Sequence, residues 1–380
     1  MDRSSEGRHY LEDVKLVDNH CHSVSLEQLS AEEFEDRLTE APSRKASVTS
    51  TFDSAAGLTL LAKCGPLVGL DPPFGPLSYI SARRQIAPET LAQRCFANAG
   101  VEVLMVDTLY SSDPLATLDQ LKMLSGAQVM PIVRLESLGE QILASSLDAA
   151  GFFDEFSAAI FAAAQDAVGL KSIAAYRFGL DLESVKPSRS QVQDAALEVV
   201  REIEAGGIGR IGGRVLCSFL AHAAIETTGL PLQFHVGYGD PDLQLDKCNP
   251  ALLTPFIRRA DALGVPVVLL HCYPYHREAA YLAHCFSNVY LDLGLTMNFV
   301  GHNASRIFAE TLELAPFAKV LYSSDAYALP ELHFLGASAF RESVDHFLES
   351  LRERELAGEA YLRRLALMFA RDNASRAYRL

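Results

Sequence analysis

Eight short apolar segments recur along the chain, and they constrain its fold more than any other feature of the sequence. They are rich in Val, Ile and Leu, and helix-like stretches or longer connections separate them. The segments begin at Leu16, Val101, Val129, Gly169, Leu232, Val267, Val289 and Val320. Because parallel strands need a crossover between them, strands that alternate with helices favour a parallel sheet.

Eight such units predict an α/β fold in which the strands close into a (β/α)8 TIM barrel with a helical C-terminus. A doubly wound open sheet is the alternative, but no Gly-x-Gly-x-x-Gly turn follows the first strand, as a dinucleotide site requires. We expect residues 1–380 to form a single barrel domain. The fourth strand is expected to run from Gly169 to Arg177, and the eighth from Val320 to Asp325.

Residues 23–86 interrupt this alternation directly after the first strand. The segment begins with an acidic, helix-prone run and then becomes apolar and rich in Gly and Pro. Connections of this length in a compact barrel are usually functional or form an inserted subdomain. We therefore expect residues 23–86 to form a lid or subdomain that shapes the substrate pocket.

The composition excludes several classes of partner. The formal net charge is -15, which argues against binding to nucleic acid or to an anionic membrane. No apolar stretch has the length of a membrane span, and the polar N-terminus lacks the apolar core of a signal peptide. The seven cysteines are scattered, so a disulfide framework is not expected. These features predict a cytoplasmic protein that acts on a small molecule, with homo-oligomer formation left open.

A His-x-His pair, His20 and His22, stands at the end of the first predicted strand. Side chains alternate faces along a strand, so both imidazoles point the same way. Such a pair can bind a divalent metal. Alone it is equally consistent with two ordinary surface or core histidines.

Three further candidate ligands, His235, His271 and Asp325, end the fifth, sixth and eighth strands. Separately, each histidine could be a satisfied core residue and Asp325 a helix N-cap. Together with the His-x-His pair they all lie at the C-terminal strand ends, where barrels place their active sites. Imidazole and carboxylate ligands suit zinc first, with iron or manganese as alternatives.

Several stretches resemble the amidohydrolase superfamily, and more closely the amidohydrolase-2 branch that includes the N-terminal domain of FluG-type proteins. The resemblance covers nearly the whole chain and is weakest over residues 23–86. The stretches that carry it are Val17-Asp18-Asn19-His20-Cys21-His22, residues 170–177, Gln233-Phe234-His235-Val236-Gly237-Tyr238-Gly239-Asp240, Tyr281-Leu282-Ala283 with residues 288–292, and Ser323-Ser324-Asp325.

The resemblance implies one or two divalent transition-metal ions. His20, His22, His235 and Asp325 would bind metal, and Asp325 would also act as a base. His271 would bind a second ion or orient the attacking water. Members with two ions bridge them with a carboxylated lysine on the fourth strand, a role that falls on Lys171. Otherwise Lys171 is a buried cation inside the barrel, with Asp107 as its candidate partner.

Arg177 at the end of the fourth strand is a candidate anchor for a substrate carboxylate, because guanidinium binds carboxylates through two parallel hydrogen bonds. A salt bridge to a loop carboxylate is the alternative. Tyr176 is a candidate for the substrate pocket. Further candidates for pocket or supporting roles are Asp240, Asp242 and His333.

The function predicted from these residues is hydrolysis of an amide, ester or thioester bond by a water that the metal activates. One alternative is a metal-dependent decarboxylase of an aromatic or dienoic acid. Another is a regulatory barrel without turnover. Cys21 and Cys272 each follow a ligand histidine on the opposite strand face, and we expect them to pack as small apolar residues.

Overall fold

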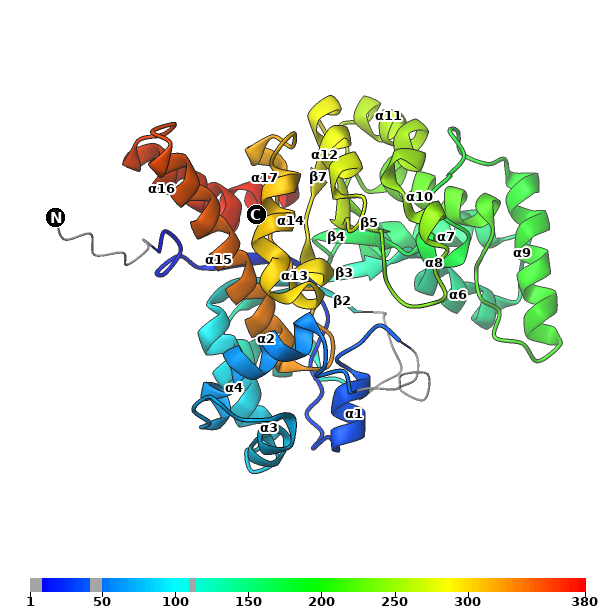
Figure 1. Cartoon of the computed structure of the whole chain (residues 1–380). Coiled ribbons are helices and arrows are strands. Elements are labelled where there is room, and N and C mark those ends of the chain that lie inside the picture. Colours follow the sequence, from blue (N-terminus) through cyan, green and yellow to red (C-terminus); the bar gives the residue numbers. More distant parts are fainter. Residues whose placement is uncertain (1–8, 42–49, 109–113) are drawn as a thin grey trace. The chain divides into compact units, whose positions relative to one another are not determined.

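The computed structural model describes residues 9–41, 50–108 and 114–380 (Figure 1). Its described strands form a sheet in sequence order, β1-β2-β3-β4-β5-β6-β7. They are β1 (Leu16–Cys21), β2 (Val101–Asp107), β3 (Gln128–Arg134), β4 (Gly169–Ser172), β5 (Leu232–Val236), β6 (Val267–His271) and β7 (Val289–Leu291). Helices alternate with these strands, so the predicted α/β barrel class is confirmed.

The helices occupy most of the connections and the C-terminal region. They are α1 (Ala31–Asp36), α2 (Ala55–Cys64), α3 (Pro76–Arg83), α4 (Pro88–Ala99), α5 (Leu118–Ser125), α6 (Leu135–Ser146), α7 (Phe152–Ala163), α8 (Ala174–Arg177), α9 (Arg189–Glu204), α10 (Arg214–Thr227), α11 (Thr254–Ala262), α12 (His276–Cys285), α13 (Gly294–Phe299), α14 (Ala304–Thr311), α15 (Pro330–Glu353), α16 (Glu359–Leu367) and α17 (Asn373–Tyr378). Among the described residues, none of these helices is long and apolar enough to cross a membrane.

The chain divides into two compact units. Unit 1 comprises Met1–Leu104, Pro114–Val129 and Leu293–Leu380, and unit 2 comprises Met105–Asp113 and Met130–Asp292. Unit 1 therefore contains the first predicted ligand pair and Asp325, whereas unit 2 contains His235, His271 and Lys171. The prediction of a single domain stays a prediction, and each unit is described by itself.

In unit 2, strands β3 to β7 pair in parallel. Lys171 of β4 is in register with Gln233 of β5, and Val236 of β5 with His271 of β6. All residues of β4, β5, β6 and β7 are buried. Strands buried on both faces are expected to be continuous apolar runs, which explains why apolar segments of the sequence were enough to locate these strands.

The prediction that the fourth strand extends to Arg177 is wrong. β4 ends at Ser172, and residues 174–177 form the short helix α8. The buried carboxylate of Glu136 accepts hydrogen bonds from the Ser172 hydroxyl (2.7 Å) and the Ile173 N–H (3.0 Å). The second bond occupies the backbone donor with which the strand would have continued, and Lys171 lies one residue from the strand end.

The predicted eighth strand is an extended segment of unit 1 without strand assignment in the described structure. It nevertheless runs beside β1. The N–H of Asn19 donates to the carbonyl of Tyr322 (2.9 Å), and the N–H of Asp325 donates to the carbonyl of His20 (3.0 Å). Asp325 has a φ of 48°, which ends the extended geometry at the ligand itself.

Helices occupy much of the described region after β1, and they belong to unit 1. Helices α1 to α4 surround a hydrophobic core that includes Phe34, Phe52, Leu60 and Tyr79, and Leu332 of α15 belongs to the same core. That residues 23–86 form an inserted subdomain stays a prediction. A function as a lid stays a prediction.

Two ion pairs connect this region to α15 and differ sharply in burial. Arg83 Nε donates to Glu331 Oε1 at 2.6 Å, and both side chains are at most 5% exposed. Lys63 pairs with Glu342, and these side chains are 37% and 50% exposed. The Tyr79 hydroxyl also donates to Glu331 Oε1, at 3.1 Å.

We expect Glu331→Ala to lower the free energy of unfolding by about 3–5 kcal/mol, because it leaves the Arg83 guanidinium buried without its counter-charge. Glu342→Ala, on the same helix, removes an exposed pair and should cost less than about 1 kcal/mol. Urea titration followed by circular dichroism measures both. Equal losses in the two variants would contradict the assignment of the buried pair as the structural contact.

Candidate metal centre

His20, His22 and Asp325 form a compact cluster in unit 1. Asp325 Oδ1 lies 3.1 Å from His20 Nε2 and 3.5 Å from His22 Nε2. The two imidazole rings meet edge to face with centroids 5.2 Å apart. Their ligand atoms all lie within 4.8 Å of one another. The structure therefore brings together three of the ligands predicted from the sequence.

The carboxylate of Asp18 connects the two segments that carry this cluster. Its Oδ1 accepts hydrogen bonds from the N–H groups of Ser324 (3.0 Å) and His20 (3.3 Å). Its Oδ2 accepts from the Ser324 hydroxyl at 2.6 Å. Asp18 is fully buried, where hydrogen bonds to a charged acceptor are strong. It thus fixes residues beside His20 and Asp325 at the same time.

Close packing fixes the Asp325 segment from its other sides. A Cβ on Gly294 of α13 would lie 2.1 Å from the Ser323 hydroxyl oxygen, so a larger residue at 294 would displace that hydroxyl from its present position. The Asn298 amide donates to the carbonyl of Ser324 at 2.8 Å. The rings of Tyr327 and His22 pack edge to face, with centroids 5.9 Å apart. These contacts hold the segment that carries Asp325, and a site whose ligands are held in this way can be preorganised.

In unit 2, a second histidine cluster forms at the ends of β5 and β6. The rings of His235 and His271 have centroids 4.8 Å apart, and the Tyr176 ring lies 4.5 Å from that of His235. His235 Nε2 donates to the carbonyl of Tyr238 at 3.0 Å. Since a carbonyl only accepts, this bond makes Nδ1 the basic nitrogen of a neutral His235.

The residue after β7 supports His271. The buried carboxylate of Asp292 accepts from the His271 N–H at 2.8 Å, and its Oδ1 lies 4.0 Å from His271 Nδ1. His271 and Cys272 have positive φ angles of 70° and 59°. Positive φ in residues with a Cβ costs of order 1–3 kcal/mol and is concentrated at functional sites.

Lys171 is 2% exposed and lies beside Gln233, two residues before His235 on the neighbouring strand. The carboxylate of Asp107, its expected alternative partner, accepts from Arg134 Nε at 3.0 Å. Burial raises the pKa of Glu136, and its bonds to the Ile173 N–H and Ser172 hydroxyl partly oppose this. Glu136 thereby fixes the strand end next to Lys171.

The predicted substrate residues differ in their surroundings. Arg177 donates from Nη2 to Glu140 Oε1 at 2.9 Å, so a substrate carboxylate would share the guanidinium with a helix residue. Asp242 pairs with Arg210 at the surface. Burial raises the pKa of Asp240. Roles for Arg177 and Tyr176 in substrate binding stay predictions.

His333 lies fully buried near His22. Burial, and secondarily the neighbouring His22, lower the pKa of His333 to about 3, against a smaller opposing effect of the His22 backbone. Its ring contacts that of Phe96, with centroids 4.7 Å apart. Cys272 is buried, and its thiol donates to the carbonyl of Leu269 at 3.2 Å, in agreement with a packing role.

Sequence reasoning assigned no role to Asp18, Glu136 or Tyr327. A role for Asp18 near the site could have been predicted, because alternation along β1 places it on the same strand face as His20 and His22. No such pattern marked Glu136 or Tyr327, since their contacts depend on how β4 and the segment after Asp325 turn.

The donor set in unit 1 fits a divalent transition metal. Two imidazoles and one carboxylate match the three protein ligands of many catalytic zinc sites. Ligand atoms in a tetrahedral zinc site lie roughly 3.3 Å apart, close to the 3.1 and 3.5 Å that separate Asp325 Oδ1 from the two histidine nitrogens. Little movement would be needed to bind an ion.

Comparisons with known proteins identify the class. The amidohydrolase sequence pattern matches residues 148–380. A protein from Lactobacillus casei ATCC 334, described as a metal-dependent hydrolase, is 31% identical, with a TM-score of 0.85 over 97% of this chain and 96% of that chain. The chain belongs to the amidohydrolase family, as the resemblance predicted.

Two further similarities show how far the comparison extends. Protein fluG of Emericella nidulans is 29% identical over an alignment of 415 positions, gaps included, that covers 98% of this chain but 46% of that protein. The chain thus spans about half the length of this relative. A uronate isomerase from Thermotoga maritima has a TM-score of 0.63 at 12% identity, covering 97% of this chain and 95% of that chain. This likeness concerns the fold alone.

Replacing His20 and His22 together by Ala should lower the bound metal by at least one equivalent while the far-ultraviolet circular dichroism stays unchanged, because the apolar strands build the core. Elemental analysis of purified protein measures the metal. His284→Ala, at an exposed position of α12, is the matched control and should keep the full metal content. An unchanged content in the double variant would exclude this cluster as a metal site.

Proposed function

We propose that the chain is a metal-dependent hydrolase that cleaves an amide, ester or thioester bond of a small molecule. The observation that carries this proposal is the His20, His22 and Asp325 cluster, with its ligand atoms within 4.8 Å of one another, in a member of the amidohydrolase family. The acidic net charge of -15 argues against nucleic acid or an anionic membrane as the partner and so supports a small-molecule substrate.

A divalent metal held by these residues would polarise a substrate carbonyl and lower the pKa of water. The side chain of Asp325 is 11% exposed, against 1% for His20, so its carboxylate is the more accessible member. We assign it the transfer of a proton from the attacking water to the leaving group. Asp18 keeps Asp325 in place through Ser324.

The roles proposed for unit 2 follow from the sequence and the family. His235 would join the metal ligands, and His271 would bind a second ion or orient water. Lys171, once carboxylated, would bridge two ions. Its position one residue from the end of β4 supports this role, because a longer strand would have left the lysine deep in the barrel.

A panel of amides, esters, thioesters and aromatic acids tests the reaction class. We expect hydrolysis of at least one acyl compound, and Asp325→Asn should lower kcat per bound metal by roughly 10²–10⁴-fold through loss of the proton-transferring group. Asp154→Asn, at an exposed surface pair, should leave kcat unchanged. Release of carbon dioxide from an aromatic acid, with no hydrolysis, would replace the proposal by the decarboxylase alternative.

Lys171→Ala should lower the metal content by at least one equivalent relative to the wild type if the carboxylated lysine bridges two ions. Bicarbonate should then speed metal loading of the wild type, since it supplies the carbon dioxide for the modification. Elemental analysis with and without bicarbonate measures both effects, and Lys122→Ala, on the surface of α5, is the control. A metal content of Lys171→Ala equal to that of the wild type would show that the lysine is a structural cation.

A further inference from the structure

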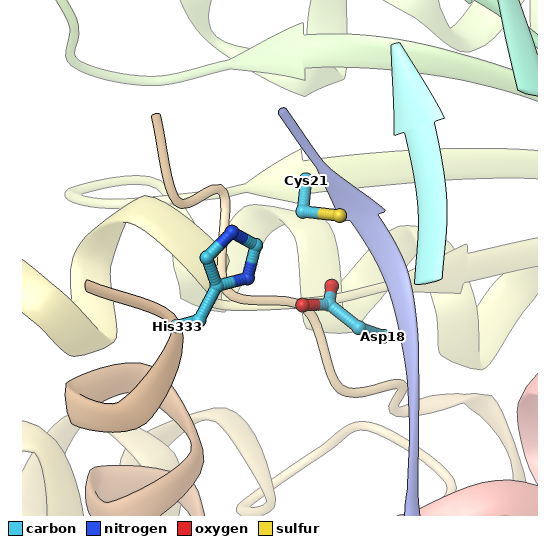
Figure 2. A group of neighbouring side chains, drawn as sticks. All are labelled: Asp18, Cys21 and His333. Atoms are coloured by element: carbon cyan, nitrogen blue, oxygen red, sulfur yellow. The ribbon is translucent and has the colours of Figure 1, made fainter. Parts of the chain in front are cut away.

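A second group of metal-ligating side chains lies in unit 1, outside the His20, His22 and Asp325 cluster. Figure 2 shows Asp18 and Cys21 of β1 and His333 of α15 pointing toward one another. Their ligand atoms all lie within 4.8 Å of one another, and the three residues are at most 1% exposed. Nothing in the proposed hydrolytic chemistry requires a thiol at this place.

His333 supplies the observation that points to a ligand. Neither Nδ1 nor Nε2 of its ring has a hydrogen-bond partner among the residues that the structure describes. The backbone of His22 approaches the ring without reaching the geometry of a normal hydrogen bond. A buried polar atom without a partner costs about 1–3 kcal/mol, and a metal ion on one nitrogen would remove part of that cost.

The three side chains match one class of cation. A thiolate, an imidazole and a carboxylate are together typical of Zn²⁺ and similar borderline-soft ions. Cys21 would lose its thiol proton to solvent on binding. The thiolate and the Asp18 carboxylate would then balance the two charges of the ion, which lowers the free-energy cost of burying it.

Asp18 would share its carboxylate between this ion and the contacts that it already makes. Its hydrogen bonds include those from the His20 N–H, the Ser324 N–H and the Ser324 hydroxyl, and carboxylates that bind a metal are commonly hydrogen-bonded as well. Ligand atoms of a tetrahedral zinc site with one sulfur lie roughly 3.3–3.6 Å apart. Small side-chain shifts would close the present group to that spacing.

We propose that Asp18, Cys21 and His333 bind a structural Zn²⁺ ion, distinct from any ion held by His20, His22 and Asp325. The ion ties α15 to β1 and stabilises the strand from which the catalytic histidines project. This site does not depend on the proposed hydrolase activity.

Cobalt substitution tests the proposal. A thiolate bound to Co²⁺ gives an intense near-ultraviolet charge-transfer absorption, which histidine and carboxylate ligands do not give. We expect this band in the cobalt-loaded wild type, its loss in Cys21→Ser and a shift or loss in His333→Gln. Cys272→Ser is the matched control, because Cys272 is also buried directly after a predicted ligand histidine, and it should keep the band.

The His20→Ala/His22→Ala double variant separates this site from the catalytic one. It should keep the charge-transfer band, and Zn²⁺ should still raise its melting temperature, whereas Cys21→Ser should lose one equivalent of zinc. Circular dichroism of Cys21→Ser and Cys21→Ala confirms that each variant is folded. No band in the folded, cobalt-loaded wild type, or a band that survives Cys21→Ser, would overturn the proposal.

Discussion

The carboxylate of Asp18 is the contact on which the candidate metal centre depends. It accepts hydrogen bonds from the N–H of His20 and from both the N–H and the hydroxyl of Ser324, so one buried charge joins two segments that are 306 residues apart. Hydrogen bonds to a charged acceptor contribute about 1.5–3 kcal/mol each. That interaction holds Asp325 beside the histidine pair whether or not an ion is bound.

Strained backbone conformations also occur at the candidate ligands. Asp325, His271 and Cys272 all have positive φ angles, a conformation that residues with a Cβ rarely adopt. His271 and Cys272 lie at the end of β6 and Asp325 at the end of an extended segment, where the chain must turn. The surrounding hydrogen bonds, such as that from the His271 N–H to Asp292, stabilise these conformations. The fold therefore sustains local strain at the residues that carry the proposed chemistry.

The strands and the side-by-side placement of His20 and His22 could be predicted because both follow from local sequence patterns. Apolar runs located β1 to β7, and alternation placed His20 and His22 on one face. Prediction failed where single side chains redirect the backbone: Glu136 ends β4 at Ser172, and the segment before Asp325 pairs with β1 without becoming a strand. Such contacts join residues far apart in the chain, and no local pattern encodes them.

Anomalous diffraction at the zinc edge from crystals of the metal-loaded protein shows whether His20, His22 and Asp325 bind metal. We expect a peak bonded to Nε2 of His20, Nε2 of His22 and the carboxylate of Asp325 at about 2.0–2.2 Å. Asp18 should keep its hydrogen bonds to Ser324 in the same crystals. A fully loaded protein with no peak at these three residues would exclude them as the metal centre.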